Sequence, residues 1–387
     1  MKDIAIIGAS YLQAPLIEKA REMGLTTHVF AWEAGDVGEK IADHFYPISI
    51  TEKEAIYEKC REIGISGITS IASDLASVTV NFVAGKLSLP GNSLDCSLIS
   101  TNKHEMREAF ERGGDPSVKS VLVHSADEIK GISINYPVIV KPLDRSGSRG
   151  ITKLYDEKGL SVAIENAKEE GFIKAALIEE YAPGNEYSVE CISHHGEHHF
   201  LAMTEKFTTG APHFIETAHL EPAGVSGEII AKVKDTVFHA LDTLKITDSA
   251  SHSELKIDEK GNIKIIEIGG RMGGDLIGSD LVYLSTGYDF LQAVIDVSLG
   301  REISASFESE SRAAAVRYVF GKEDAEVFDR LLSEHPEFLV RKDIHEITDN
   351  EVSDSSERFG YFLIKGPSRE ALLPYLPSQP VESEGRL

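Results

Sequence analysis

Within the first 95 residues, apolar runs that suit strands alternate with amphipathic runs that suit helices. The chain opens with IAIIGAS, an amphipathic stretch from Pro15 to Met23 and the apolar run THVFAW; a helical pattern from Glu52 to Ile63 and a strand-like GITSIAS follow. Such alternation predicts βαβ units, whose strands lie parallel in one sheet. We therefore predict an α/β domain with a parallel sheet over residues 1–100.

A glycine ends the first predicted strand, at the edge where an open Rossmann-like sheet binds its ligands. The turn that begins at Gly8 reads GASYLQ and lacks the GxGxxG spacing of a dinucleotide site. A plain turn between strand and helix therefore explains Gly8 better than a nicotinamide cofactor does. An oxidoreductase is the least favoured function that we consider.

Composition narrows the range of partners. The chain has 387 residues, enough for two or three domains, and no apolar run approaches the ~20 residues of a membrane span. A formal net charge of -24 without a basic patch argues against nucleic acid. Three widely spaced cysteines and the lack of an export signal favour the cytoplasm. We expect small-molecule partners.

Beyond Asn102 the alternation gives way to an α+β pattern. A helical KHEMREAFERGG precedes the strand-like SVLVH and PVIVKP, and after residue 300 come a strand-like RAAAVRYVF, a helical AEVFDRLLSEH and a strand-like GYFLIKG. These patterns predict a middle domain over residues 101–300, with a subdomain at roughly 104–180, and a small α+β closing domain over 301–387. The expected class is α/β plus α+β.

A glycine-rich loop follows the predicted strand PVIVK, which ends at Lys141. The loop runs DRSGSRG from Asp144 to Gly150, and the strand-like ITKLY comes next. Its glycines let backbone N–H groups approach phosphate oxygens, and its serine hydroxyls add donors. Because it joins two strands, it differs from a Walker A loop, which begins a helix. It is either a mobile phosphate cradle or a plain glycine hairpin with one exposed lysine.

Two glutamates are predicted to face each other across a hairpin. The strand-like HSELKID and IKIIEI flank EKGN, and a turn centred between Lys260 and Gly261 pairs residues whose numbers sum to 521. Glu254 and Glu267 meet this condition, which sets their Cβ atoms about 4.5–5.5 Å apart. Facing carboxylates suit Mg²⁺, which takes carboxylate, water and phosphate oxygens. The alternative is a solvated face that neighbouring lysines balance.

Two further stretches carry charges in unusual settings. In IGGRMGGD, glycines flank Arg271, whose fork of donors suits a carboxylate or a charged transition state. The stretch TEKFTTGAPHFIETAHLEPA reads as a loop that either recognises a zwitterionic substrate or is simply exposed and polar. It carries Lys206, His213, Glu216 and His219 among small and turn residues. A zinc site is disfavoured there, because the histidines are scattered and no HExxH helix is present.

Taken in order, these motifs resemble the ATP-grasp superfamily across nearly the whole chain. The series comprises a Rossmann-like pre-domain, TNK, PVIVKP, SGSRG, IEEYAPGNEYSVE, HSE and IEIGGR. The resemblance implies a ligase that uses Mg-ATP to activate a carboxylate as an acyl phosphate and joins it to an amine. ETAH with Arg271 looks like the amino-acid ligases of the superfamily, which make dipeptides, so amino acids are the expected substrates.

The resemblance also implies roles for individual residues. Those assigned to ATP are Lys103, Lys141, Ser146, Gly147, Ser148 and Gly150 at the phosphates, Glu180, Tyr181 and Ala182 at the adenine hinge, Glu179 near the exocyclic amine and Glu186 at the ribose. Glu254 and Glu267 are expected to hold Mg²⁺, or Mn²⁺ in its place. The catalytic set is Arg271, which steadies the acyl phosphate, with Lys141, Glu216 and His219.

One position departs from the superfamily, and it keeps alternatives open. Gly269 stands two residues after Glu267, where many members have an asparagine that binds metal. The alternatives are another ATP-grasp reaction, such as carboxylation, and a nucleotide-responsive binding module without catalysis. The pre-domain and ETAH also differ from D-alanine:D-alanine ligase, so its substrate is not carried over. Soluble enzymes of this build often pair symmetrically, which makes a homodimer an expectation.

Overall fold

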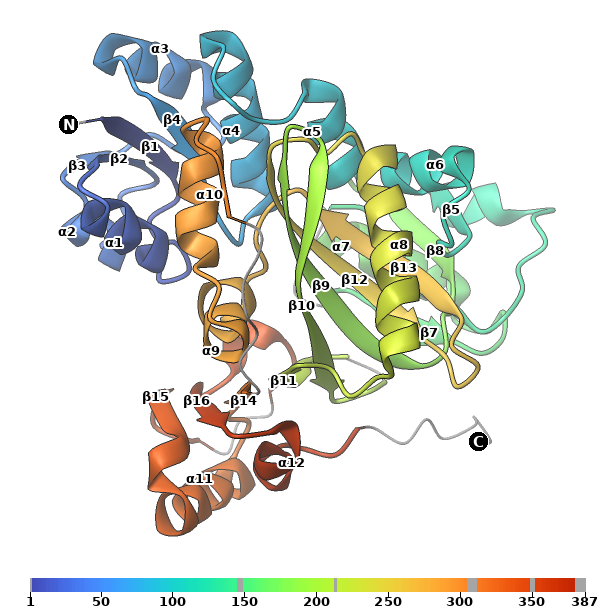
Figure 1. The fold of residues 1–387 in the computed structure, drawn as a ribbon. Helices are drawn as coiled ribbons and strands as arrows, with labels where there is room; N and C mark the ends of the chain where they lie inside the picture. The colour runs from blue at the N-terminus through green and yellow to red at the C-terminus, as the bar shows by residue number, and fades with distance from the viewer. Residues whose placement is uncertain (1, 145–148, 212–213, 305–311, 349–351, 380–387) are drawn as a thin grey trace.

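The computed structural model of this chain describes residues 2–144, 149–211, 214–304, 312–348 and 352–379. They form three β-sheets with helices packed around them (Figure 1). The predicted α/β plus α+β class is confirmed, because one sheet is parallel and the other two are antiparallel. The three cysteines are free and buried. No helix in the described part of the chain is long and apolar enough to cross a membrane.

The first sheet is parallel, with the strand order β3-β2-β1-β4. Its elements are β1 (Asp3–Ile7), α1 (Ala14–Glu22), β2 (Thr26–Phe30), α2 (Val37–Ile41), β3 (His44–Tyr46), α3 (Lys53–Ile63), β4 (Gly67–Thr69), α4 (Asp74–Leu87) and α5 (Leu94–Thr101). Side chains of β1 alternate between two layers: Ile4 and Ile6 pack against α1, and Ala5 and Ile7 against α3 and α4. The alternation predicted for this region is confirmed.

The second sheet is antiparallel, with the order β5-β8-β6-β7. Its elements are α6 (Lys103–Gly113), β5 (Ser120–Val123), η1 (Ala126–Ile129), β6 (Val138–Pro142), β7 (Thr152–Leu154), α7 (Leu160–Glu170) and β8 (Ala176–Glu180). The loop between β6 and β7 therefore joins two paired strands, as predicted. Asn102 caps α6 by accepting hydrogen bonds from two backbone N–H groups, which fixes Lys103 in the first helical turn.

The third sheet has eight antiparallel strands in the order β13-β12-β9-β10-β11-β14-β16-β15. Its strands are β9 (Asn185–His194), β10 (Glu197–Thr208), β11 (Glu216–Glu221), β12 (Ser249–Ile257), β13 (Ile263–Gly269), β14 (Ala313–Tyr318), β15 (Leu339–Ile344) and β16 (Gly360–Gly366). The segment beyond residue 301 thus adds three strands to one edge of this sheet. The predicted boundaries near residues 100 and 300 stay predictions.

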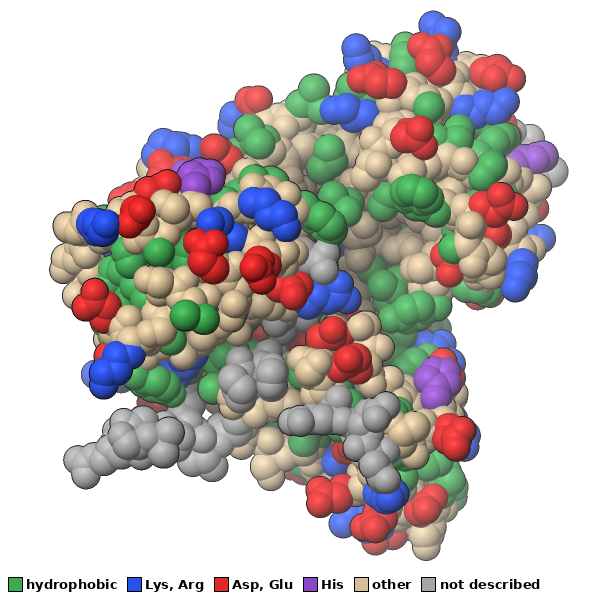
Figure 2. Space-filling model, turned by 180° about the vertical axis from the view of Figure 1, so that it is seen from behind, with side chains coloured by type: hydrophobic (Ala, Val, Ile, Leu, Met, Phe, Trp, Pro, Cys, Tyr) green, Lys and Arg blue, Asp and Glu red, His purple; other side chains and the backbone are tan. Residues whose placement is uncertain are grey.

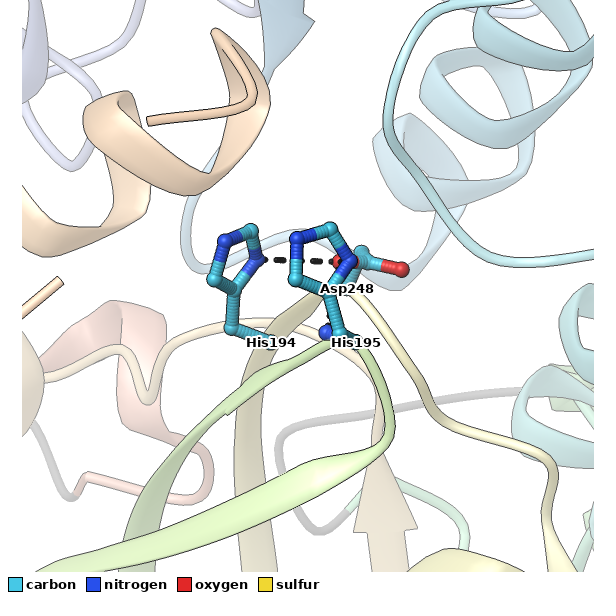
Figure 3. Close-up of side chains that lie close together, drawn as sticks. All are labelled: His194, His195 and Asp248. Atoms are coloured by element: carbon cyan, nitrogen blue, oxygen red, sulfur yellow. Dashed lines mark hydrogen bonds and ion pairs between the residues drawn. The ribbon is translucent and has the colours of Figure 1, made fainter. Parts of the chain in front are cut away.

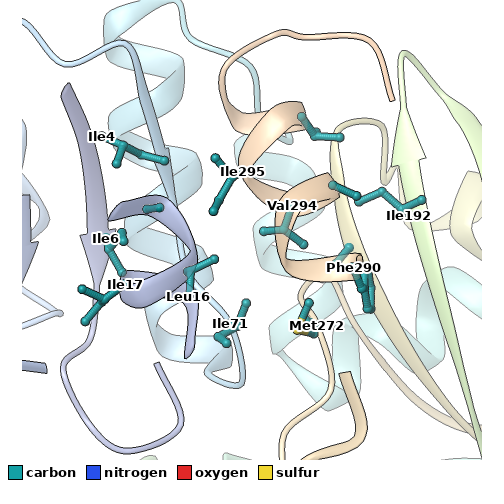
Figure 4. Packing of buried hydrophobic residues seen from close by; sticks show 14 of the residues in the cluster. Ile4, Ile6, Leu16, Ile17, Ile71, Ile192, Met272, Phe290, Val294 and Ile295 are labelled. Atoms are coloured by element: carbon teal, nitrogen blue, oxygen red, sulfur yellow. The ribbon is translucent and has the colours of Figure 1, made fainter. Parts of the chain in front are cut away.

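The helices around the third sheet complete the fold. They are α8 (Gly227–Thr243), the π-helical η2 (Ile277–Leu281), α9 (Val282–Thr286), α10 (Phe290–Ser298), α11 (Lys322–Glu334), η3 (Pro336–Phe338), η4 (Ser355–Glu357), α12 (Arg369–Leu372) and η5 (Leu373–Tyr375). Among them, α10 lies between the first and third sheets (Figure 4). It buries Val294 and Ile295 in one core with Leu16 of α1 and Ile192 of β9. This packing holds the loops of the first sheet beside the third.

Candidate active site

A cavity of about 590 Å³ lies where the three sheets approach one another. It is bordered by Tyr11 and Asp74 beside the first sheet, Arg149 beside the second, Glu254 of the third and Arg358 after η4. Seen from behind, the molecule is hollowed between its lobes (Figure 2). Of the described residues predicted for the site, all except Gly150 line this cavity: Lys103, Lys141, Glu179, Glu180, Tyr181, Ala182, Glu186, Glu216, His219, Glu254, Glu267 and Arg271.

Glu254 of β12 and Glu267 of β13 lie directly opposite each other, as predicted. The route to this pairing differs from the prediction. Near the turn, pairs such as Ile257 with Ile263 have numbers that sum to 520, and a β-bulge after Glu254 shifts the sum to 521. The predicted turn centre is therefore wrong by half a residue. The bulge, which leaves Ile266 without an opposite residue, is what sets the two glutamates across from each other.

The buried ammonium group of Lys206 contacts three carboxylates, one of which is Glu254 of this pair. Nζ of Lys206 lies 2.8 Å from Glu254, 3.1 Å from Glu186 and 3.6 Å from Glu216. Burial lowers the pKa of Lys206, but these carboxylates outweigh burial and hold the pKa well above its usual value. Lys206 is therefore charged at neutral pH, with a side chain only 2% exposed.

The facing glutamates fit a divalent cation. Burial raises the pKa of Glu254, but Lys206 outweighs burial and holds the pKa well below its usual value, so the carboxylate is ionised. Lys103 forms an ion pair with Glu267, with Nζ 2.8 Å from Oε1. Both carboxylates thus already accept cationic partners through hard oxygen atoms, which are the donors that Mg²⁺ prefers. Glu254 and Glu267 are the residues that would hold such an ion.

Lys141 of β6 belongs to a buried triad. Its Nζ lies 2.7 Å from Glu179 of the neighbouring strand β8, and Nε of Arg107 of α6 lies 2.9 Å from the same carboxylate. Burial raises the pKa of Glu179, but Arg107 and Lys141 outweigh burial and lower the pKa to about 2. Arg107 was not predicted, because its pattern in the sequence is that of any helical arginine. Glu179, predicted near the adenine amine, fixes the Lys141 ammonium group at the cavity wall.

Arg271 is held by a carboxylate from the first sheet's side of the cavity. Its Nε and Nη2 donate to the two oxygens of Asp74, at 2.8 and 3.0 Å, in a bidentate pair. A Cβ atom on Gly269 would lie 2.8 Å from Asp74 Oδ1. Asp74 therefore fills the space that a side chain at position 269 would need. This close approach is a physical reason for glycine at the one position that departs from the superfamily pattern.

The stretch predicted as a polar loop is mostly strand, so that prediction is wrong. Lys206 lies on β10 and is paired with His219 of β11, and Glu216 begins β11. The glycine and proline of the short connection made the whole stretch look irregular. His213 lies outside the described residues. Lys206 and His219 are buried, so an exposed polar loop is excluded for them.

An arginine from the C-terminal segment closes this side of the cavity. Arg358 donates to Glu216 at 3.0 Å and to Asp275 at 2.9 Å, and its guanidinium lies 3.8 Å from the centre of the Tyr318 ring. Burial, reinforced by the charge of Lys206, lowers the pKa of His219 to about 3. His219 is therefore a neutral imidazole at physiological pH. No sequence pattern pointed to Arg358, which directly follows the short helix η4.

The residues predicted to form the adenine hinge line the cavity on the second sheet's side. Tyr181 follows β8, and the ammonium group of Lys153 on β7 lies 3.3 Å from the centre of its ring. Gly150 adopts a positive φ of 66°, and its neighbour Arg149 borders the cavity. Three residues predicted at the phosphates lie outside the described residues: Ser146, Gly147 and Ser148.

A histidine supports Glu254 from within the sheet. His252 contacts Glu190 through Nδ1, and its Nε2 lies 3.4 Å from Glu254. Glu190 also accepts the backbone N–H of Gly273 at 2.9 Å. Burial lowers the pKa of His252, but Glu190 outweighs burial and raises the pKa to about 9. The imidazolium can therefore donate to both carboxylates and fix the orientation of Glu254.

We expect Glu221→Gln to stabilise the protein at pH 8 and to change little at pH 4. Burial raises the pKa of Glu221 to about 7, although Thr204 and Ser285 donate to its carboxylate at 2.6 and 2.9 Å. The folded state thus favours the protonated form of Glu221. The stability that this protonation contributes is fully present below pH 4.5 and is lost as the pH rises through about 7. Glutamine mimics that form, and urea unfolding at both pH values should show a gain of about 1–3 kcal/mol at pH 8 only. The exposed Glu111→Gln is the control, and equal pH dependence of wild type and Glu221→Gln would contradict the assignment.

Comparisons with known proteins point to the same superfamily as the sequence motifs. Residues 134–280 match the ATP-grasp domain family. An alanine–anticapsin ligase from Bacillus subtilis is 24% identical over 79% of this chain and 67% of its own length. For the enzyme of the same name from Bacillus amyloliquefaciens, the chain spans 62% of its length at 25% identity. The resemblance to the ATP-grasp superfamily that the motifs predicted is confirmed.

Solved structures share the fold over almost the whole chain. A crystal structure of an L-amino acid ligase from Bacillus licheniformis matches with a TM-score of 0.83 and 21% identity, covering 97% of this chain and 96% of that one. The biotin carboxylase domain of a 2-oxoglutarate carboxylase from Hydrogenobacter thermophilus, solved with MgADP, matches with a TM-score of 0.75 and 17% identity, covering 96% and 88%. A ligase and a carboxylase domain thus share the fold of this chain.

Proposed function

We propose, from the match of residues 134–280 to the ATP-grasp domain family, that this chain is a ligase that uses Mg-ATP to activate a carboxylate as an acyl phosphate and joins it to an amine. One observation carries the proposal above the others. The facing carboxylates Glu254 and Glu267, each paired with a buried lysine, share one cavity with Arg271 and Glu216. A cation site and an anion-binding arginine therefore lie in the same space as groups suited to an amine.

The charge of each side chain suggests which part of the reactants it would contact. Lys103 and Lys141 offer ammonium groups to the phosphates of ATP, and Mg²⁺ on the two glutamates would neutralise charge on those phosphates. Arg271, oriented by its bidentate pair with Asp74, offers donors to the acyl phosphate and to the charge that develops when the amine attacks. No covalent enzyme intermediate is required.

At the amine, the geometry favours Glu216 over His219 as the group that accepts a proton. A neutral imidazole with a pKa of about 3 is a weak base, whereas the pKa of Glu216 is raised by burial even though Lys206 opposes that effect. Glu216 and Asp275 can both accept hydrogen bonds from an ammonium group, and Arg358 holds them together. We therefore assign amino acids as the substrate class and give His219 a positioning role.

The test is ADP release from ATP and Mg²⁺ in the presence of single amino acids and of pairs, with products identified by mass. We expect ADP to form only when a carboxylate and an acceptor amine are both present, together with a product whose mass equals the sum of the two substrates minus one water. ADP release with bicarbonate and no amine would favour carboxylation instead. Nucleotide binding without turnover under any of these conditions would favour a binding module.

The remaining expectations concern the surroundings of the enzyme. We propose small-molecule partners alone, a cytoplasmic location and a symmetric homodimer. The chain spans about two thirds of the length of the alanine–anticapsin ligases that it matches, so their substrates are not transferred to it. Sedimentation equilibrium of the purified chain separates a dimer from a monomer.

A further inference from the structure

A cluster of two histidines and an aspartate lies at the far end of the third sheet from the catalytic carboxylates. His194 ends β9, His195 is the next residue, and Asp248 immediately precedes β12 (Figure 3). One ligand atom from each of them lies within 4.8 Å of those from the other two. Asp248 and Glu254 are six positions apart on one extended strand, which separates them by about 20 Å. The cluster is therefore not part of the cavity described above.

We propose that His194, His195 and Asp248 form a second metal site that takes a transition-metal ion such as Zn²⁺, distinct from the Mg²⁺ of the catalytic cavity. Two imidazole nitrogens and one carboxylate oxygen suit Zn²⁺, Ni²⁺ or Cu²⁺, whereas Mg²⁺ prefers oxygen donors alone. Three protein ligands leave further positions for water or for another side chain.

The distances suit coordination after small movements. His194 Nδ1 lies 3.0 Å and His195 Nδ1 lies 3.8 Å from the same oxygen, Oδ1 of Asp248. Ligand atoms around a tetrahedral ion with bonds of about 2.0–2.1 Å are separated by roughly 3.3 Å, which falls between these two values. The two rings already lie side by side, with centroids 3.9 Å apart. Only the exposed His195 side chain needs to move appreciably.

Asp248 is held in place by groups other than the histidine rings. The side-chain oxygen of Asn92 accepts the backbone N–H groups of Thr247 and Asp248, at 2.8 and 3.1 Å, and its amide nitrogen donates to Ser249 at 2.9 Å. The backbone N–H of His195 donates to Asp248 Oδ1 at 3.0 Å. The carboxylate is thus presented to both rings by a rigid segment, as a preorganised metal ligand requires.

A purely structural role leaves the backbone conformation of His195 unexplained. His195 has a positive φ of 53° in a two-residue turn with Gly196, a position that asparagine or glycine usually occupies. An imidazole at this turn position is presented directly beside the Asp248 carboxylate.

A fourth ligand is close by. Glu197 lies directly across from His194 in the β9–β10 ladder, on the same face of the sheet, and its side chain is exposed. Rotation of that side chain toward His194 would add a second carboxylate to the set. An ion held by these residues would tie the β9–β10 turn to the start of β12, which is the strand that carries Glu254.

The test is zinc binding by the metal-stripped full chain without a histidine tag, measured by calorimetry in excess Mg²⁺. We expect one Zn²⁺ per chain, and at least about tenfold weaker binding in His195→Asn and in Asp248→Asn. Asparagine readily adopts the left-handed conformation, so His195→Asn retains the turn. Zn²⁺ should also raise the melting temperature of the wild type more than that of either variant.

Two control variants locate the ion. His345 is exposed, with Nδ1 3.9 Å from Asp343, and His345→Ala should bind Zn²⁺ as the wild type does. Glu254→Gln should also retain zinc binding, because the proposed site does not include the catalytic carboxylates. The proposal is overturned if the wild type shows no saturable binding, if His195→Asn and Asp248→Asn bind as tightly as the wild type, or if Glu254→Gln alone abolishes binding.

Discussion

Glutamine in place of Glu254 should lower kcat for ADP release about 100- to 1,000-fold and shift the Mg²⁺ dependence to higher concentrations. The substitution keeps the size of the side chain and one acceptor oxygen, but it removes the negative charge that faces Glu267 across the hairpin. Lys206 keeps its contacts with Glu186 and Glu216, so the fold should be retained. The measurement is a coupled assay of ADP at a series of Mg²⁺ concentrations, at saturating ATP.

The matched control is Glu259→Gln, which makes the same change on the exposed turn of the same hairpin. Its kcat and its Mg²⁺ dependence should equal those of the wild type. Circular dichroism of both variants checks that the fold is unchanged. If Glu254→Gln retained wild-type kcat and the same Mg²⁺ dependence, the assignment of this carboxylate to a metal site would be wrong.

The parts of the fold that the sequence predicted are those whose signals are local. The strands of the first sheet and the helices α1 and α3 each show their own period over a few residues, and short βαβ connections make the strands parallel neighbours. The helices α2, α4 and α5 were not predicted. The loop between β6 and β7 was likewise placed between two strands, because the strand patterns on both sides of it are short and contiguous. The strands after residue 301 show the limit, since no local pattern indicates that β14 pairs with β11 and so extends the third sheet.

The glutamate pair shows how a prediction from hairpin geometry can reach the right residues by an incomplete route. The two strand patterns and the turn residues gave the pairing of Glu254 with Glu267. The bulge that makes the pairing correct could not be predicted, because a single extra residue in one strand changes the register without changing the composition.

The charged partners that surround the predicted residues were missed for a different reason. Arg107, Asp74 and Arg358 come from segments far away in sequence, and each looks like an ordinary exposed charge there. These side chains reach the cavity only when the sheets pack together. Each can be buried there because it pairs with an opposite charge. Gly269 was the one sequence signal for any of these partners. A glycine at a position where a metal ligand is expected can mark the close approach of another group, which here is Asp74.

Methionine in place of Lys206 should lower the free energy of unfolding by about 3–5 kcal/mol at neutral pH and abolish measurable ligation. The ammonium group is the shared partner of Glu186, Glu216 and Glu254, and its removal leaves buried carboxylates to repel one another. Urea unfolding measures the loss. The exposed Lys234→Met should leave the unfolding midpoint within experimental error of the wild type.

Two further observations separate this account from a simple packing defect. Lys206 lowers the pKa of Glu254 in the folded state. The resulting stability is fully present above the unfolded-state pKa of 4.5 and is lost as the pH falls through the lower folded-state pKa. The difference between wild type and Lys206→Met should therefore narrow below pH 4.5, whereas a packing defect would persist. Mg²⁺ without nucleotide should raise the melting temperature of Lys206→Met more than that of the wild type, because a divalent ion can replace the missing charge among the carboxylates. Equal effects of Mg²⁺ on both proteins would mean that these carboxylates do not form a cation site once the lysine is gone.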